Sequence, residues 1–167
     1  MTLTQKETLL LNDLKSQEQL CIDKYTEDEK SACDPALRTV FGDIKKTEES
    51  HLSTVNRILG GEEVVMPSDT PKAKNVDCKP STCSEESKKH DKFLLQDALA
   101  TEKHVSSLYN VSVFEFSSPV LRDTLAHIQK EEQNHGQTLY SYMSVNGMYS
   151  EFESTPSYSL GRCFFIF

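Results

Sequence analysis

Carboxylate and imidazole side chains interrupt the apolar faces of four predicted helices at a regular spacing. In residues 35–59, apolar positions follow one another in alternating steps of four and three residues, which is the spacing of one helix face. Glu48 and His51 occupy two successive positions of that series. In the four predicted helices, six polar residues occupy a position where the spacing calls for an apolar side chain, and the pattern predicts that all six point into the core. They are Glu18, Glu48, His51, Glu102, Glu132 and His135.

Burying four carboxylates without partners is costly, because a medium of low polarity disfavours the charged form. Two divalent cations carry enough charge to neutralise four carboxylates. Carboxylate oxygen together with imidazole nitrogen suits iron or manganese, and also zinc. The sequence therefore predicts a site for two divalent metal ions, most favourably iron or manganese, with the six residues as its ligands.

The two halves of the chain repeat each other at an offset of 84 residues. Aligned without a gap, 13 of the 48 positions from 9 to 56 are identical to positions 93 to 140. The identical positions include every candidate ligand, since 18, 48 and 51 match 102, 132 and 135. This pattern indicates a duplicated helix hairpin. At ~1.5 Å of rise per residue, the ligands on the two antiparallel helices of a hairpin lie at nearly the same height.

Helix start and stop signals divide the chain into four helices and a linker. Asp34-Pro35 and Ser118-Pro119 are cap residues followed by proline at the first helical position, and Gly60-Gly61 is a stop signal. Residues 111–116 alternate apolar and polar side chains, and we interpret them as a helix end and turn. The expected helices span residues 4–30, 35–59, 84–112 and 119–146.

These elements predict an all-α fold, a four-helix bundle built from two duplicated hairpins with one long crossover. The hairpins are residues 4–59 and 84–146, and the linker is residues 60–83. Residues 1–149 form one domain in this interpretation, and residues 150–167 form a C-terminal tail. The apolar end of that tail is either a docking segment or a terminus without a role.

Composition excludes several classes of function. The chain has 26 acidic and 18 basic residues and a net charge of −8, which argues against nucleic acid and anionic membranes as partners. No apolar run reaches the roughly 18 residues that a membrane span needs. The first residues lack the basic and then apolar layout of a secretory signal, so synthesis in the cytoplasm is expected.

Other polar residues have simpler interpretations. The odd number of cysteines, with no framework spacing, predicts mostly free thiols. The four-residue spacing of Cys78 and Cys83 is weak evidence for zinc, and a free or cross-linking thiol is preferred. Glu49 and Glu131, beside the ligand positions, are expected in solvent. Two tyrosines at positions 25 and 109 are interpreted as core residues, with electron relay as the alternative.

Two resemblances accompany this reading. The first concerns the arrangement of the candidate ligands, with one Glu on each of two helices and a Glu-x-x-His motif on each of the other two. This arrangement resembles that of the ferritin-like di-iron and di-manganese carboxylate proteins. Over residues 1 to about 149, the chain also resembles the coat-F group of bacterial spore coat proteins. This resemblance implies a ferritin-like fold, a place in the spore coat, and other coat proteins or a second copy as partners. The segments that carry it are residues 3–7, 18–25, 106–109, 114–116, 127–135 and 142–149.

Two functions remain open from the sequence. One is a structural coat constituent in which metal ties the four helices together. The other is a di-metal oxidoreductase of the peroxidase, catalase or ferroxidase type, acting on peroxide or oxygen to protect the spore. An enzyme needs an open coordination position, whereas a structural site is closed, and the sequence does not distinguish these two states.

Overall fold

Four long helices make up most of the described chain. A computed structural model describes residues 2–65, 70–73 and 79–149. No strand occurs within these ranges, so the all-α prediction is confirmed. The predicted tail, residues 150–167, lies outside the described residues. The helices are α1 (Gln5–Ser31), α2 (Pro35–Leu59), α3 (Glu85–Glu115) and α4 (Pro119–Val145).

The predicted helix boundaries hold to within one residue except at the end of α3. Residues 111–116, interpreted as a helix end and turn, instead continue the helix to Glu115. The added residues pack Val113 against the core and bring Glu115 into an ion pair with Lys6 of α1. Contacts between the hairpins therefore outweigh the local alternation of apolar and polar residues.

Each helix begins at a polar cap residue. The side chains of Asp34, Ser84 and Ser118 accept hydrogen bonds from backbone N–H groups in the first turns of α2, α3 and α4. Thr4 and Glu7 form a reciprocal capping box at the start of α1. These caps satisfy backbone donors that a helix start otherwise leaves without a partner.

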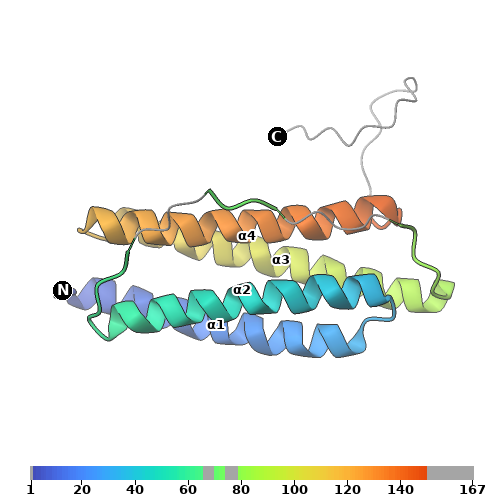
Figure 1. Cartoon of the computed structure of the whole chain (residues 1–167), viewed down its shortest axis with the longest axis horizontal. Coiled ribbons are helices and arrows are strands. Elements are labelled where there is room, and N and C mark those ends of the chain that lie inside the picture. Colours follow the sequence, from blue (N-terminus) through green and yellow to red (C-terminus); the bar gives the residue numbers. More distant parts are fainter. Residues whose placement is uncertain (1, 66–69, 74–78, 150–167) are drawn as a thin grey trace, which may run out of the picture.

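The helices form a four-helix bundle in which neighbours run in opposite directions (Figure 1). The closest packing lies within the hairpins, between α1 and α2 and between α3 and α4, while α1 also contacts α3 and α2 contacts α4. Helix α2 ends at one end of the bundle, and α3 begins at the other. The connection between them therefore crosses the length of the bundle, as predicted for a long crossover.

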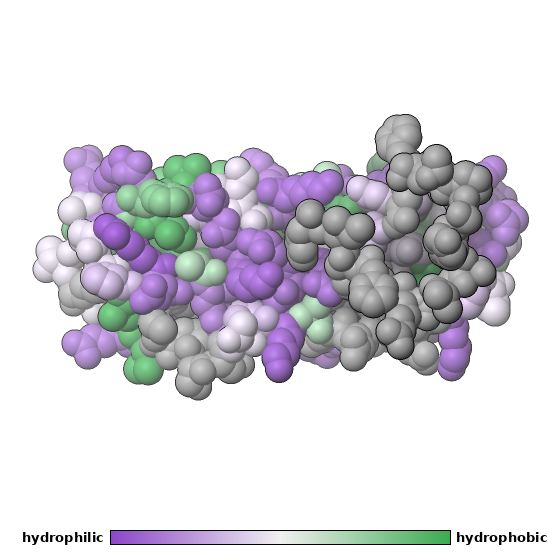
Figure 2. Space-filling model, turned by 90° about the horizontal axis from the view of Figure 1, so that it is seen from above, coloured by the Kyte–Doolittle hydropathy of each residue, from purple (hydrophilic) through white to green (hydrophobic). Residues whose placement is uncertain are grey.

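The surface is mainly hydrophilic on the face that Figure 2 shows, with hydrophobic residues gathered toward the end where α3 finishes and α4 begins. Exposed apolar side chains in this part of the sequence are Val111, Phe114 and Val120. None of the described helices has the length and apolar character needed to cross a membrane.

Matching contacts close the turns of the two hairpins. Arg38 Nε donates a hydrogen bond to the carbonyl of Ala32, at 2.6 Å, across the turn between α1 and α2. Arg122 Nε donates to the carbonyl of Phe116, at 2.5 Å, across the turn between α3 and α4. Both donor and acceptor positions differ by 84 residues, so the sequence repeat corresponds to a repeated structural contact.

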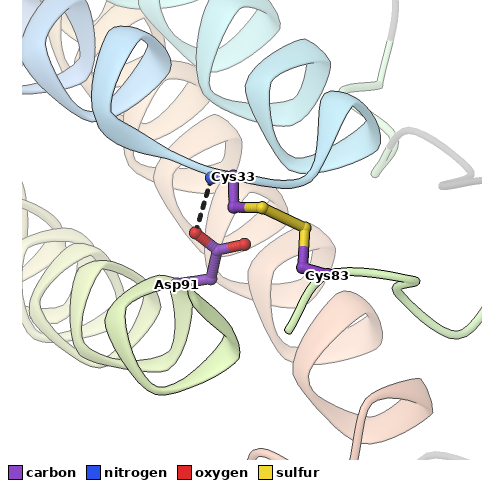
Figure 3. A group of neighbouring side chains, drawn as sticks. All are labelled: Cys33, Cys83 and Asp91. Carbon is purple, nitrogen blue, oxygen red and sulfur yellow. Dashed lines mark hydrogen bonds between the residues drawn. A yellow bond between two sulfur atoms is a disulfide. The ribbon is translucent and has the colours of Figure 1, made fainter. Parts of the chain in front are cut away.

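Each hairpin also receives a carboxylate from the other. Glu7 of α1 accepts a hydrogen bond of 2.8 Å from the backbone N–H of Ser117. At the matching positions, Asp91 of α3 accepts one of 2.8 Å from the N–H of Cys33 and another of 3.1 Å from the N–H of Asp34. Figure 3 shows Asp91 pointing from α3 toward the α1–α2 turn. These paired contacts fix the height of one hairpin against the other.

A disulfide joins Cys33 to Cys83, so the prediction of mostly free thiols is wrong for these two residues (Figure 3). Their Cα atoms lie 6.5 Å apart, within the usual range for a disulfide. The partners are 50 residues apart in sequence, and only the folded chain brings Cys83, two residues before α3, beside the α1–α2 turn. Cys21 is a buried free thiol. Cys78 and Cys163 lie outside the described residues.

Candidate metal centre

The six predicted ligand residues come together in one buried layer in the middle of the bundle. Their residue exposures run from 0% to 8%, with His135 the most exposed. Helices α1 and α3 each provide one carboxylate, and α2 and α4 each provide a carboxylate and an imidazole one turn further along. The predicted juxtaposition is therefore confirmed, while the role of these residues as ligands remains a prediction.

The layer divides into two groups of side chains that could each hold a metal ion. One group contains Glu18, Glu48, His51 and Glu132, and the other contains Glu48, Glu102, Glu132 and His135. Within each group, the candidate ligand atoms all lie within 4.8 Å of one another. Glu48 and Glu132 belong to both groups, so these two carboxylates lie between the two candidate metal positions.

Both imidazoles direct Nδ1 toward the carboxylates. His51 Nδ1 lies 3.0 Å from Glu132 Oε1 and 3.2 Å from Glu48 Oε2. His135 Nδ1 lies 2.9 Å from Glu48 Oε1 and 3.3 Å from Glu102 Oε2. The two rings are stacked with their centroids 5.9 Å apart. The side chains therefore present two nitrogen atoms and four carboxylates to a common centre.

Burial and mutual contact separate the pKa values of the four carboxyls. Burial raises the pKa of Glu18 to about 8 and raises the pKa of Glu102 well above its ordinary range. Burial acts on Glu48 in the same direction, but contacts with His135 and His51 outweigh it and lower the pKa of Glu48. For Glu132, the same two imidazoles outweigh burial and the charge of Glu48, so its pKa is lowered as well.

The carboxylates raise the pKa values of the two imidazoles. Burial alone would lower the pKa of both histidines, but contacts of His51 with Glu131 and Glu132, and of His135 with Glu102 and Glu132, raise both pKa values well above 6.5. Without a metal, these shifts at neutral pH favour two imidazolium groups beside the carboxylates of Glu48 and Glu132, with Glu18 and Glu102 in the protonated form. This agrees with the expectation that burial without metal protonates part of the set.

Several polar atoms in this layer have no hydrogen-bond partner, although they are shielded from water. They include both oxygens of Glu132 and His135 Nδ1, which contacts carboxylates outside hydrogen-bond geometry. Buried acceptors without donors are rare and costly. Such atoms converging on one centre are the donor set that a divalent cation would complete. The remaining members are Glu18 Oε2, Glu48 Oε1 and Glu102 Oε2.

Two tyrosines contact the layer. The sequence analysis interpreted them as core residues and did not predict this contact. The hydroxyl of Tyr25 donates to Glu102 Oε1, and the hydroxyl of Tyr109 donates to Glu18 Oε1. Each tyrosine thus reaches from one hairpin to the carboxyl of the other. Burial raises the pKa of both hydroxyls, which remain donors. The signal available in the sequence was the identical seven-residue spacing from Glu to Tyr in the two halves.

Glu131 is a further residue of the centre, and the expectation that it lies in solvent is wrong. Its Oε2 lies 3.0 Å from His51 Nε2, and its side chain is only 28% exposed. The residue precedes Glu132 on α4 and faces α2 rather than solvent, because a helix face that packs on a neighbour is wider than one residue. Glu49, treated in the same way in the sequence, is exposed as expected.

A third cluster, at the end of the bundle, has a structural explanation. Cys33, Cys83 and Asp91 lie close enough together to suggest a metal site. The two sulfur atoms are joined in a disulfide, and both oxygens of Asp91 already accept backbone hydrogen bonds. This group therefore links the first hairpin to the start of α3 through a disulfide and two hydrogen bonds.

Comparison with known proteins finds a family similarity in the second half of the chain. The family model described as the Coat F domain matches residues 90–153, which include most of α3 and all of α4. No curated protein and no solved structure matches the chain. The matched segment contains Glu102, Glu132 and His135. Residues 90–153 are therefore similar to the Coat F domain, which agrees in this part of the chain with the resemblance to the coat-F group of spore coat proteins.

Proposed function

We propose that this protein is a constituent of the bacterial spore coat whose four-helix bundle binds two divalent metal ions. The similarity of residues 90–153 to the Coat F domain supports the coat assignment. The disulfide between Cys33 and Cys83 is consistent with it, because disulfides persist in oxidising surroundings rather than in a reducing cytoplasm. Other coat proteins are the expected partners.

The observation that carries the metal proposal is the convergence of buried, unpartnered carboxylate oxygens on two imidazole nitrogens. Glu18 and His51 would bind one ion, and Glu102 and His135 would bind the other. The two carboxylates that lie between the groups, Glu48 and Glu132, would bridge the ions. Oxygen and nitrogen donors in this mixture favour iron or manganese.

Charge balance supports the same arrangement. Two divalent ions with four carboxylates and two neutral imidazoles make a neutral centre, as the protonated set does without metal. Binding would therefore displace protons from Glu18, Glu102 and both histidines, whose pKa values are raised. Since ligands must lose those protons, metal affinity should increase as the pH rises.

The metal proposal is tested by thermal unfolding of the full chain before and after removal of metal with a chelator. Because binding favours the folded state, metal-loaded protein should unfold at a higher temperature than metal-free protein. Glu18→Ala should reduce this difference, whereas Glu49→Ala should not, since Glu49 is exposed. Unchanged unfolding in protein shown to have lost bound metal would contradict a role for metal in the fold.

The coat proposal has an independent test. An antibody against the full chain should detect the protein in washed spores and in coat extracts made with a reducing agent. Abundant protein in vegetative cytoplasm, together with none in washed spores, would contradict the proposal whatever the metal content.

A second candidate is a di-metal oxidoreductase acting on peroxide or oxygen, and the observation that favours it is the pair of tyrosines. Tyr25 and Tyr109 place oxidisable side chains in hydrogen-bond contact with two candidate ligands. Bound iron or manganese would supply the redox chemistry. Metal-loaded protein should then consume peroxide faster than free metal ion does. The double variant His51→Ala/His135→Ala should lose that rate, and a retained rate would exclude this function.

A further inference from the structure

The two histidines of the candidate metal centre differ in the contacts of Nε2, the ring nitrogen that points away from the carboxylate layer. His51 directs Nδ1 into the carboxylate layer and Nε2 toward Glu131 Oε2, at 3.0 Å. His127 lies beyond, with Nε2 3.6 Å from the same Glu131 oxygen. If Nδ1 of His51 binds a metal, Nε2 carries the ring proton and donates it to Glu131 in a hydrogen bond.

His135 lacks this outer carboxylate. At the 84-residue offset, the position of Glu131 is occupied in the first hairpin by Thr47. The Thr47 hydroxyl donates to the carbonyl of Asp43 in its own helix, at 3.3 Å. Among the described residues, every carboxylate contact of His135 uses Nδ1. The repeat is therefore broken at the one residue that orients an imidazole from outside the layer.

We propose that Glu131 positions His51 and thereby makes the two metal positions unequal in affinity. The position with His51 binds its ion more tightly, and the position with His135 binds its ion more weakly and exchanges it more readily. This inference rests on the proposed metal site. Its physical basis is that a carboxylate behind a metal-binding imidazole fixes the ring orientation and increases its basicity, and losing such a partner lowers metal affinity about 10- to 100-fold.

Burial agrees with this order. His51 is 2% exposed, whereas His135 is 8% exposed and is the most accessible of the six candidate ligands. The tighter position is therefore also the more enclosed one. Glu131 is close enough to solvent, at 28% side-chain exposure, to be replaced without opening the core.

Calorimetric titration of Mn²⁺ into the metal-free full chain tests the proposal. Wild type should bind in two resolved steps, the first about 10-fold or more tighter than the second. Glu131→Gln, which keeps the side-chain volume, should weaken the first step about 10- to 100-fold and leave the second unchanged. Glu49→Gln, on the exposed side of α2, is the matched control and should change neither step.

The complementary variant is Thr47→Glu, which places a carboxylate at the matching position of the first hairpin. It should tighten the second step, so that the two steps merge near the affinity of the first. His51→Ala should abolish the tight step, and His135→Ala should abolish the weak one. Unfolding of each metal-free variant checks that the bundle is intact, since a general loss of packing would weaken both steps together.

The possible failures are distinct. No Mn²⁺ binding to wild type would overturn the proposed metal site itself. Two equal steps in wild type, or two unequal steps that Glu131→Gln leaves unchanged, would overturn the role of Glu131 while leaving the site in place. If Glu131→Gln does not fold, an unaltered second step in Thr47→Glu would overturn the inference on its own.

Discussion

The two hairpins build the same centre but are fastened in different ways. In both, an arginine closes the turn, a carboxylate from the other hairpin binds the turn backbone, and a tyrosine reaches a glutamate across the bundle. The first turn also carries the disulfide between Cys33 and Cys83, whereas the matching position of Cys33 in the second hairpin is Ser117. The outer carboxylate Glu131 likewise has only Thr47 as its counterpart.

This comparison separates the contacts that both hairpins repeat from the contacts that occur only once in the bundle. The contacts of Glu7 and Asp91, and those of Tyr25 and Tyr109, cross between the hairpins in matched pairs and hold the height of one hairpin against the other. The disulfide and the contact of Glu131 with His51 also join the two halves, but they lie outside the layer of six residues and have no counterpart at the 84-residue offset. The centre is thus nearly symmetric, while its supports are not.

The largest effect is expected from removing a shared carboxylate, because Glu48 and Glu132 both contact the two imidazoles. Glu48→Ala and Glu132→Ala should each lower the free energy of unfolding of the metal-free protein by about 3–5 kcal/mol, the usual cost of breaking a buried ion pair. Urea unfolding at pH 7 measures this cost. The comparison predicts equal losses in the two hairpins, and a loss below about 1 kcal/mol for either variant would contradict a shared role.

The disulfide, which has no counterpart at the second turn, should give the next largest effect. Reduction, or the double variant Cys33→Ser/Cys83→Ser, releases a 50-residue loop and should cost up to about 4 kcal/mol of unfolding free energy. Urea unfolding with and without a reducing agent measures this cost. Wild type should respond to the reducing agent and the double variant should not. An equal response of both would show that the disulfide does not stabilise the fold.

Glu7 and Asp91 provide a matched test of the contacts between hairpins. Each accepts a backbone hydrogen bond from the opposite turn, so Glu7→Gln and Asp91→Asn should each cost about 2 kcal/mol, as expected for hydrogen bonds to a charged group. Urea unfolding at pH 7 measures both. A large loss in one variant with none in the other would show that the two turns are not held equivalently.

The Glu7 contact should also depend on pH. Backbone hydrogen bonds from Ser117 and Thr4 lower the pKa of Glu7 from 4.5 to about 2. Its stabilising contribution is therefore complete above pH 4.5 and is lost as the pH falls from 4.5 toward 2. The stability difference between wild type and Glu7→Gln should shrink across this interval. A constant difference would contradict an ionised Glu7 in the folded protein.

The smallest effect is expected from the two tyrosine hydroxyls. Tyr25→Phe and Tyr109→Phe should each cost about 1 kcal/mol, because each removes one buried hydrogen bond while keeping the ring. Unfolding curves of the two single variants should coincide. If only one variant is destabilised, the crossed contacts are not equivalent and the symmetry of the centre is weaker than its geometry indicates.

Local patterns were sufficient to predict the scaffold and the inward-facing residues. Cap residues and prolines marked the helix starts, and the spacing of apolar positions placed Glu48 and His51 on a buried face. The offset of 84 residues then extended that assignment to the other hairpin. These features depend on residues within one or two helical turns, which is why sequence alone revealed them.

Features that depend on packing between distant segments could not be predicted in the same way. The Cys33–Cys83 pair, the extension of α3 to Glu115 and the contact between Glu131 and His51 all involve partners far apart in the chain. Nothing in the local sequence around Glu131 distinguishes a residue facing α2 from one facing solvent. Glu131 meets His51 only because α4 packs against α2 in the folded bundle.

The proposed metal centre holds two divalent ions between matched residues of the two hairpins. It is tested most directly by the metal content of the full chain, purified without added metal and then loaded with iron or manganese, measured by mass spectrometry after removal of unbound ions. We predict two ions per chain in wild type and in Glu49→Ala, and almost none in Glu48→Ala or Glu132→Ala. Wild type without bound metal, or the same content in all four proteins, would contradict this account.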